Sequence, residues 1–261
     1  MWLSEGNMSD TVVESGAQAT GLSQWQRVAN TFTAPSKTFE DIKRGNKSWW
    51  MPFVIMALVS YLFFAAVFVK IGMQKVVDNQ IKLDPKTEER LAQVPAEQRE
   101  TQLKISVYIT EGVFIAQPVI MLAVVALGSL GLWGTINFVF GGKATFGSIF
   151  TVWMYAGLPG IVKALLGIVV IFAGIDPDSF NIKNFAPTNL AAFVFPNAAE
   201  ANKALYSLMS SLDVVTIWTL VLLAIGTATV AGVKRNSGYI AVFGWWAIFV
   251  LIGVGIAAVT G

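Results

Sequence analysis

Five long runs of apolar residues follow one another along this chain, with polar segments between them. The runs cover residues 51–72, 112–140, 146–175, 213–233 and 239–260. A helix of about 20 apolar residues crosses the hydrocarbon core of a bilayer, and inside that core only helices and closed barrels satisfy their backbone hydrogen bonds. Membrane strands need much shorter runs than these. The pattern therefore predicts an all-α polytopic membrane protein, with a bundle of five transmembrane helices within residues 49–261.

Composition agrees with a chain that is mostly dissolved in lipid. Of the 261 residues, 55% are hydrophobic and 13% are charged, whereas about 25% of an ordinary soluble domain is charged. The charges gather in residues 1–50 and 74–111. The lipid bilayer is therefore the first expected partner. The net charge is +2 and the basic residues are scattered, so no clustered basic face indicates nucleic acid.

The residue types that carry most chemistry are missing from the sequence. The chain contains no His and no Cys, which excludes thiol catalysis, imidazole acid–base catalysis and most zinc sites. Paired carboxylates within a span and a Gly-x-Ser-x-Gly motif are also missing. We therefore expect no catalytic residue, no metal ion and no cofactor, and an intramembrane enzyme is the weakest of the functional alternatives.

A polar N-terminal part precedes the first apolar run. Residues 1–22 are small and polar, and are predicted to be disordered. Residues 23–48 contain apolar side chains at helical spacing. These are Trp25, Val28, Phe32, Phe39 and Ile42. Such a segment beside a span is suited to lie in the headgroup plane, so we predict an N-terminal amphipathic interfacial helix with these five side chains facing lipid.

The loops indicate the orientation of the chain. Lys37, Lys43, Arg44 and Lys47 stand next to the first run, and no basic residue follows Arg235. Basic residues prefer the cytoplasmic side, so we expect a cytoplasmic N-terminus and an external C-terminus. The first loop would then be outside, although it holds six Lys or Arg residues; it also holds six Asp or Glu residues.

Two of the loops have features of their own. In the first loop, Pro85 and Pro95 each stand where a helix can begin, so a helical loop is predicted, with the helix after Pro95 continuing into the second span. The third loop, residues 176–212, contains the apolar island Leu190–Phe195. Six residues cannot span a bilayer. The island either enters the outer interface or covers the bundle, and the sequence does not decide between these two.

One charged residue interrupts the third apolar run. About 12 uncharged residues separate Lys163 from Asp176, roughly 18 Å of helix. A lysine side chain cannot reach the interface over that distance, so its ammonium group needs a partner or water within the protein. Tyr155, Pro159 and Lys163 are spaced by four residues and would share one helix face. The proline also leaves the Tyr155 carbonyl without its usual donor.

Two interpretations of Lys163 remain open at this point. It is either a substrate or proton site of a small transporter or channel, or a structural lysine satisfied by carbonyls and by an acid such as Asp213 or Glu111. The structural interpretation is favoured, because no second ionisable group within a span offers a proton relay. We take Tyr155, Pro159, Lys163 and Asp213 as the candidate intramembrane polar site.

A pair of acids flanks a proline at the start of the third loop. Asp176 and Asp178, with Asn181 and Asn184 nearby, are of the type that binds divalent cations. The spacing and closing Glu of a Ca²⁺ loop are absent. A turn with a capping side chain is the favoured interpretation.

Several short motifs, in order along residues 25–258, resemble one family. They are Phe32–Ile42 (FTAPSKTFEDI), Ser48–Pro52 (SWWMP), Gly141–Phe146 (GGKATF), Tyr155–Pro159 (YAGLP), Leu212–Trp218 (LDVVTIW) and Ala224–Gly226 (AIG). The chain is similar to the bacterial Yip-domain proteins, relatives of the eukaryotic membrane proteins that interact with Ypt/Rab GTPases. The resemblance implies five spans, a cytoplasmic N-terminus, and a role in membrane organisation or trafficking.

This chain also departs from the eukaryotic members of that family. Its first loop is charged and helical and its third loop is long. We therefore do not extend the GTPase binding of the eukaryotic members to this chain. The function expected is that of a non-enzymatic integral membrane protein that acts by interaction, with a small transporter or channel using Lys163 as the alternative. Expected partners are the bilayer and a second copy or other membrane proteins, in a bacterial inner membrane.

Overall fold

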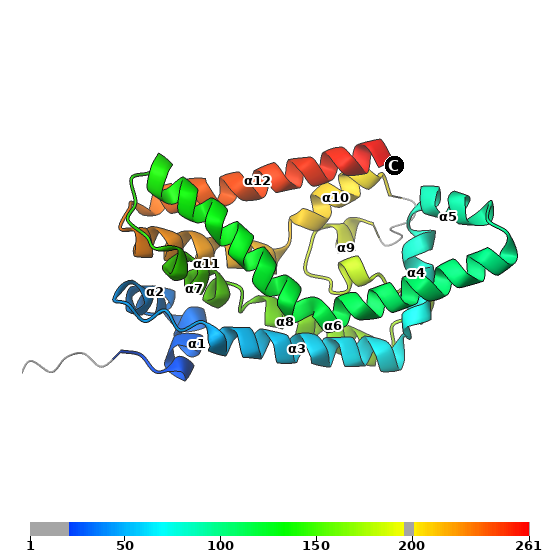
Figure 1. Cartoon of the computed structure of the whole chain (residues 1–261), viewed down its shortest axis with the longest axis horizontal. Coiled ribbons are helices and arrows are strands. Elements are labelled where there is room, and N and C mark those ends of the chain that lie inside the picture. Colours follow the sequence, from blue (N-terminus) through cyan, green and yellow to red (C-terminus); the bar gives the residue numbers. More distant parts are fainter. Residues whose placement is uncertain (1–20, 196–200, 261) are drawn as a thin grey trace, which may run out of the picture.

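The computed structural model describes residues 21–195 and 201–260, and all regular elements within them are helical. Within these described residues, five helical segments are long and apolar enough to cross a membrane. They are α3 (Trp50–Lys70), α6 (Ala96–Gly134) with the π-helical turn η1 (Thr135–Val139), α7 (Phe146–Ala156) with α8 (Gly160–Phe172), α11 (Val214–Ala231) and α12 (Arg235–Thr260). The prediction of an all-α bundle with five spans is confirmed (Figure 1). The tail predicted to be disordered, residues 1–22, lies almost wholly outside the described residues.

Local sequence explains where the spans begin, end and break. α11 begins after Asp213, whose carboxylate accepts a hydrogen bond from the Thr216 amide at 2.8 Å, and it ends at Gly232, where φ is +70°. An acid at the N-cap and a left-handed glycine after the last turn are the residues that such ends favour. The third span is two helices, because Pro159 has no amide hydrogen and a turn over Gly157–Pro159 replaces the helical ladder.

The first loop is helical, as predicted. It contains α4 (Met73–Lys82) and α5 (Pro85–Ala92), and α6 starts directly after Pro95 and runs without interruption into the membrane. The apolar side of α4 is buried, with Val76 1% exposed, and α4 packs on α6 and on the third loop. The first loop is therefore a folded cap on one end of the bundle.

The third loop packs against the bundle, but its apolar island is largely exposed, so neither of the two placements left open by the sequence is decided. It contains two 3₁₀ turns, η2 (Pro177–Ser179) and η3 (Ile182–Asn184), and two short helices, α9 (Ala191–Val194) and α10 (Lys203–Ser211). Phe180, Ala186 and Ala191 are buried between the helices, while α10 packs along α12. Within the apolar island, Ala191 faces the protein and Phe193 is exposed.

The N-terminal amphipathic segment is a hairpin of α1 (Gln24–Thr33) and α2 (Pro35–Lys43) that packs on α7 and α11. Phe39 and Ile42 have no exposed surface, so the prediction that they face lipid is wrong. The physical reason is the close approach of α11. A Cβ atom at Gly226 would lie 2.9 Å from the Phe39 ring, and only glycine leaves that space.

The other three residues of the predicted interfacial face lie nearer the surface. Val28 and Phe32 are partly buried against the same core, and the Phe32 ring meets Trp218 edge-on at 5.7 Å. Trp25 is 67% exposed. Of the five side chains, Trp25 alone therefore keeps an outward position suited to the headgroup region.

We expect Phe39→Ala to destabilise the protein strongly and Trp25→Ala to change its stability little. Removing a fully buried ring costs about 3–5 kcal/mol of unfolding free energy, whereas an exposed substitution usually changes it by less than about 0.5 kcal/mol. The midpoint of thermal unfolding in detergent measures both. Two equally small shifts would contradict the docked hairpin.

Candidate functional site

Lys163 and Asp213 form an ion pair between the third span and the start of the fourth. Lys163 Nζ lies 2.9 Å from Asp213 Oδ2. The Asp213 side chain is 2% exposed and that of Lys163 is 24% exposed. Lys163 Nζ also lies 5.7 Å from the ring centre of Phe185. The ammonium group is thus neutralised by a carboxylate and rests on an aromatic face.

Asp213 gathers three segments of the chain at one point. Besides Lys163, its Oδ2 atom accepts a hydrogen bond from the Thr188 hydroxyl at 2.6 Å, and its Oδ1 atom caps α11 through the Thr216 amide. Its backbone pairs with Asn189 in an isolated antiparallel bridge. A buried carboxylate needs several donors as well as a counter-ion, and Asp213 has both.

The structure separates two of the predicted site residues from this pair. Tyr155 does not share a helix face with Lys163, since the turn at Pro159 interrupts the spacing of four residues on which that prediction rested. The Tyr155 hydroxyl instead lies 3.0 Å from Gln24 Oε1 and 3.3 Å from the Ser48 carbonyl. Pro159 contributes the break and no polar group.

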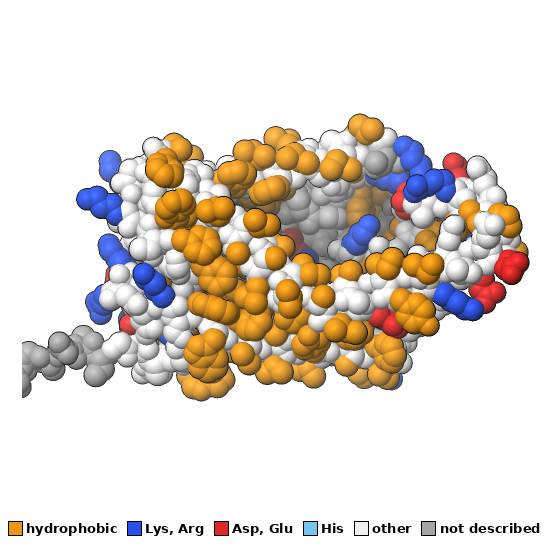
Figure 2. Space-filling model, in the orientation of Figure 1, with side chains coloured by type: hydrophobic (Ala, Val, Ile, Leu, Met, Phe, Trp, Pro, Cys, Tyr) orange, Lys and Arg blue, Asp and Glu red, His pale blue; other side chains and the backbone are white. Residues whose placement is uncertain are grey.

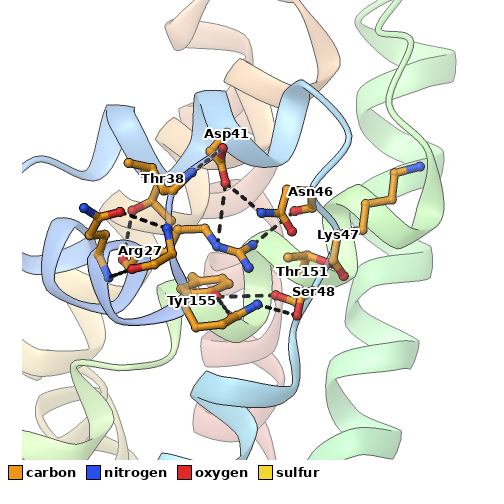
Figure 3. Close-up of polar contacts among 12 residues, drawn as sticks. Arg27, Thr38, Asp41, Asn46, Lys47, Ser48, Thr151 and Tyr155 are labelled. Atoms are coloured by element: carbon orange, nitrogen blue, oxygen red, sulfur yellow. Dashed lines mark hydrogen bonds and ion pairs between the residues drawn. The ribbon is translucent and has the colours of Figure 1, made fainter. Parts of the chain in front are cut away.

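Tyr155 belongs to a second buried cluster, around Arg27, which the sequence reasoning missed (Figure 3). The Arg27 guanidinium group has no exposed surface and lies 5.1 Å from the centre of the Tyr155 ring. Its Nε atom is 3.6 Å from Asp41 Oδ2, and its Nη1 atom donates to the Asn46 carbonyl at 3.1 Å. Asn46 Nδ2 in turn donates to Asp41 Oδ2 at 3.1 Å.

The Arg27 cluster joins α1, α2, the segment before α3 and the helix α7. Thr31 and Thr38 both donate to the Arg27 carbonyl, at 2.8 and 2.9 Å, and the Thr151 hydroxyl donates to the Lys47 carbonyl at 3.0 Å. A weak sequence signal exists, since Arg27 and Thr31 are four residues apart on one face of α1. The partners that complete the cluster are distant in sequence, and hydrophobic patterning does not show them.

The acids of the third loop have structural partners. Asp176 Oδ1 accepts a hydrogen bond from the Asp178 amide at 3.0 Å, and Lys75 Nζ lies 2.6 Å from Asp178 Oδ1. This hydrogen bond from Lys75 holds the pKa of Asp178 below its usual range. No group of three metal-ligating side chains occurs among residues 21–195 and 201–260. Asp178 thus ties the third loop to α4.

A lateral cleft opens between α6 and α12. Figure 2 shows a deep hollow between these two helices, with charged side chains inside it. At one end of the cleft is an apolar pocket of about 520 Å³. Its wall includes Val124, Leu127, Gly128, Gly131, Trp153, Trp245 and Phe249. A Cβ atom at Gly128 would collide with the indole of Trp153, so this glycine allows the Trp153 ring to form part of the wall.

Further along α12, a polar pocket of about 310 Å³ lies beneath α10. The residues around it include Asp84, Asn181, Lys183, Asn184, Lys203, Tyr206, Ser210 and Ala257. The Tyr206 hydroxyl accepts hydrogen bonds from the side-chain amides of Asn181 and Asn184, at 3.4 and 3.0 Å. The cleft therefore combines an apolar region and a polar region along the same helix.

Comparison with known proteins identifies the family. A model of the Yip1 domain matches residues 29–257, which is most of the chain. The chain belongs to the Yip1 domain family. It is also 26% identical over 233 residues to "Membrane protein YknW" of Bacillus subtilis (strain 168), a match that covers 88% of this chain and 90% of the relative. No solved structure matches the chain significantly.

Membership of the Yip1 family confirms the resemblance found in the sequence. The matched region begins within α1 and ends within α12, so the hairpin, all five spans and both folded loops are parts of one Yip1 domain. The relative is described only as a membrane protein. Multi-pass insertion and contact with lipid therefore follow for this Yip1-family protein.

A double-mutant cycle on Lys163 and Asp213 is expected to reveal strong coupling. Lys163→Met leaves a buried carboxylate without a cation, which costs about 3–5 kcal/mol of unfolding free energy. Adding Asp213→Asn removes that charge while keeping an oxygen that can cap α11, so the double variant should recover most of the loss. Unfolding of the four proteins in detergent measures the coupling. Additive effects would show that the two charges are independent.

Proposed function

We propose that this Yip1-family protein is a non-enzymatic component of membrane organisation that acts by binding within the bilayer, at the cleft between α6 and α12. The observation that carries this proposal is that the charge of Lys163 is already neutralised within the protein, while the cleft remains open to a ligand. Lys163 is held by Asp213, whereas the cleft is open, has apolar walls and reaches a polar pocket. Such a concave site is suited to binding.

The surroundings of Lys163 also argue against catalysis as the function. Among residues 21–195 and 201–260, no second carboxylate pairs with Lys163 that could share or relay a proton, and the sequence has no His or Cys to take that part. Asp213 already accepts hydrogen bonds from three donors. A carboxylate so occupied is poorly placed to act as a general base.

We further propose that the N-terminus is cytoplasmic and the C-terminus external, in the inner membrane of a bacterium. The basic side chains support this orientation. The hairpin and the segment before α3 contain Lys37, Lys43, Arg44 and Lys47. The two loops at that end contain Lys143 and Lys234, and Arg235 is the first residue of α12. Figure 2 shows Lys and Arg side chains at that end of the molecule.

Reporter fusions at both ends test the orientation. A cytoplasmic reporter should be active at the N-terminus and inactive at the C-terminus, and a reporter that requires export should give the reverse. The basic residues beside α3 supply the physical reason. Activity of the cytoplasmic reporter at both ends would refute the proposed topology.

The alternative function is a small transporter or channel. Two observations favour it, namely the 24% exposure of the Lys163 side chain and the interruption of the third span at Pro159. Broken helices beside a midplane charge are typical of transporters. The ion pair and the packing of the third loop against the bundle weigh against it.

Complementation of a strain that lacks the gene separates the two functions. The double variant Val124→Trp/Leu127→Trp narrows the cleft, so we expect that it no longer complements the deletion strain. The double variant Lys163→Met/Asp213→Asn removes both charges of the ion pair, and we expect that it still complements. Leu58→Trp/Leu62→Trp is the matched control, because both leucines are 60% exposed on the lipid side of α3. If the variant with the narrowed cleft complements and the variant without the two charges does not, the transporter function is favoured. Detergent-extracted amounts of each protein control for folding.

A further inference from the structure

We propose that the cleft between α6 and α12 binds one phospholipid, with an acyl chain in the apolar pocket and the phosphate group in the polar pocket. This inference rests on the proposed function and names the ligand class of the same site. It is carried by three independent features of the cleft: the chemistry of its inner wall, the distance between its two pockets and the charge of its polar end.

The apolar pocket is suited to hydrocarbon and not to water. It lies between membrane-spanning helices, and its wall offers almost no polar atom. Trp245 has one polar atom, and its Nε1–H group donates to Thr135 Oγ1 at 3.0 Å. Water in such a space would have too few hydrogen-bond partners. The acyl chains of the surrounding bilayer are therefore its natural occupants.

The distance between the pockets fits one leaflet. Phe249 lines the apolar pocket and Ala257 lines the polar pocket, both on α12. Eight residues of helix correspond to about 12 Å, and half of the hydrocarbon core measures about 15 Å. A phospholipid whose phosphate lies near Ala257 can therefore place its acyl chain beside Phe249 and Trp245.

The polar pocket has the charge and donors that a phosphate requires. Lys183 is exposed and has no carboxylate partner among the described residues, and Lys203 shares Asp84 at 3.8 Å. Lys183 therefore supplies one positive charge that no described carboxylate neutralises. Ser210 adds a buried hydroxyl oxygen without a hydrogen-bond partner in the described structure. Charge-assisted hydrogen bonds to phosphate oxygens would satisfy these groups.

Photolabelling of the full chain tests the proposal. The protein is reconstituted in neutral phosphatidylcholine vesicles that contain a trace of phosphatidylglycerol with a diazirine in one acyl chain. After irradiation, we expect label on α12 around Trp245 and Phe249 in excess of label on α3. Val124→Trp/Leu127→Trp should reduce the α12 label, and Leu58→Trp/Leu62→Trp should leave it unchanged.

A second comparison tests whether the polar pocket binds the phosphate group. Lys183→Gln should lower the α12 label roughly fivefold, the factor that corresponds to about 1 kcal/mol for one basic residue at an anionic lipid surface. Lys104→Gln is the matched control, because Lys104 is exposed on α6 and lies outside both pockets. Diacylglycerol with the same diazirine should label α12 weakly. Equal labelling by diacylglycerol, or no effect of Lys183→Gln, would overturn the phosphate site.

Failure of this inference can be distinguished from failure of the proposed function. Equal labelling of α3 and α12 overturns the lipid site. If the cleft variant then still fails in complementation, the cleft binds another occupant, such as a helix of a second protein, and the proposed function stands. If the cleft variant complements as well as its α3 control, the proposed function itself is wrong.

Discussion

The ion pair between Lys163 and Asp213 is the constraint on which the half of this protein around the third loop depends. A lysine in the middle of a span is costly unless its charge is compensated, by about 2.5–3.5 kcal/mol on insertion scales. Asp213 compensates it, and the same carboxylate holds Thr188 and begins α11. One acid therefore fixes the third span, the fourth span and the third loop relative to one another. Residues of the third loop also line the polar pocket at one end of the cleft, so the pair helps to fix that part of the cleft.

The sequence predicts the fold well because lipid imposes a simple rule. Runs of apolar residues long enough to cross the bilayer must be helices, and all five appear where the pattern placed them. The prolines at 85 and 95 likewise mark the starts of α5 and α6. These features depend on residues that are neighbours in the chain, and local reasoning is sufficient for them.

What the sequence could not give depends on contacts between distant segments. Phe39 and Ile42 have the same amphipathic pattern whether they face lipid or protein. What decides between the two is the missing side chain at Gly226, which is 187 residues after Phe39 in the sequence. Arg27 resembles any basic residue of a juxtamembrane helix until Asp41 and Tyr155 surround it. The cleft is a space between helices, and no single residue encodes it. The prediction that Tyr155 shares a helix face with Lys163 is wrong because the turn before and at Pro159 interrupts the helical spacing between the two residues.

The π-helical turn at the end of α6 has a consequence for how the family can be aligned. A π-helical ring contains one residue more than an α-helical ring, so η1 holds one residue that a regular helix would not need. That residue turns Asn137 toward Ala144, with which its side chain exchanges two hydrogen bonds of 2.9 Å. Removing it would close the turn into ordinary α-helix and rotate Asn137 by about 100° around the axis. A related sequence that is one residue shorter at this point would therefore keep a regular helix and lose only the two hydrogen bonds between Asn137 and Ala144. The same deletion elsewhere in α6 would turn every later side chain away from its neighbours.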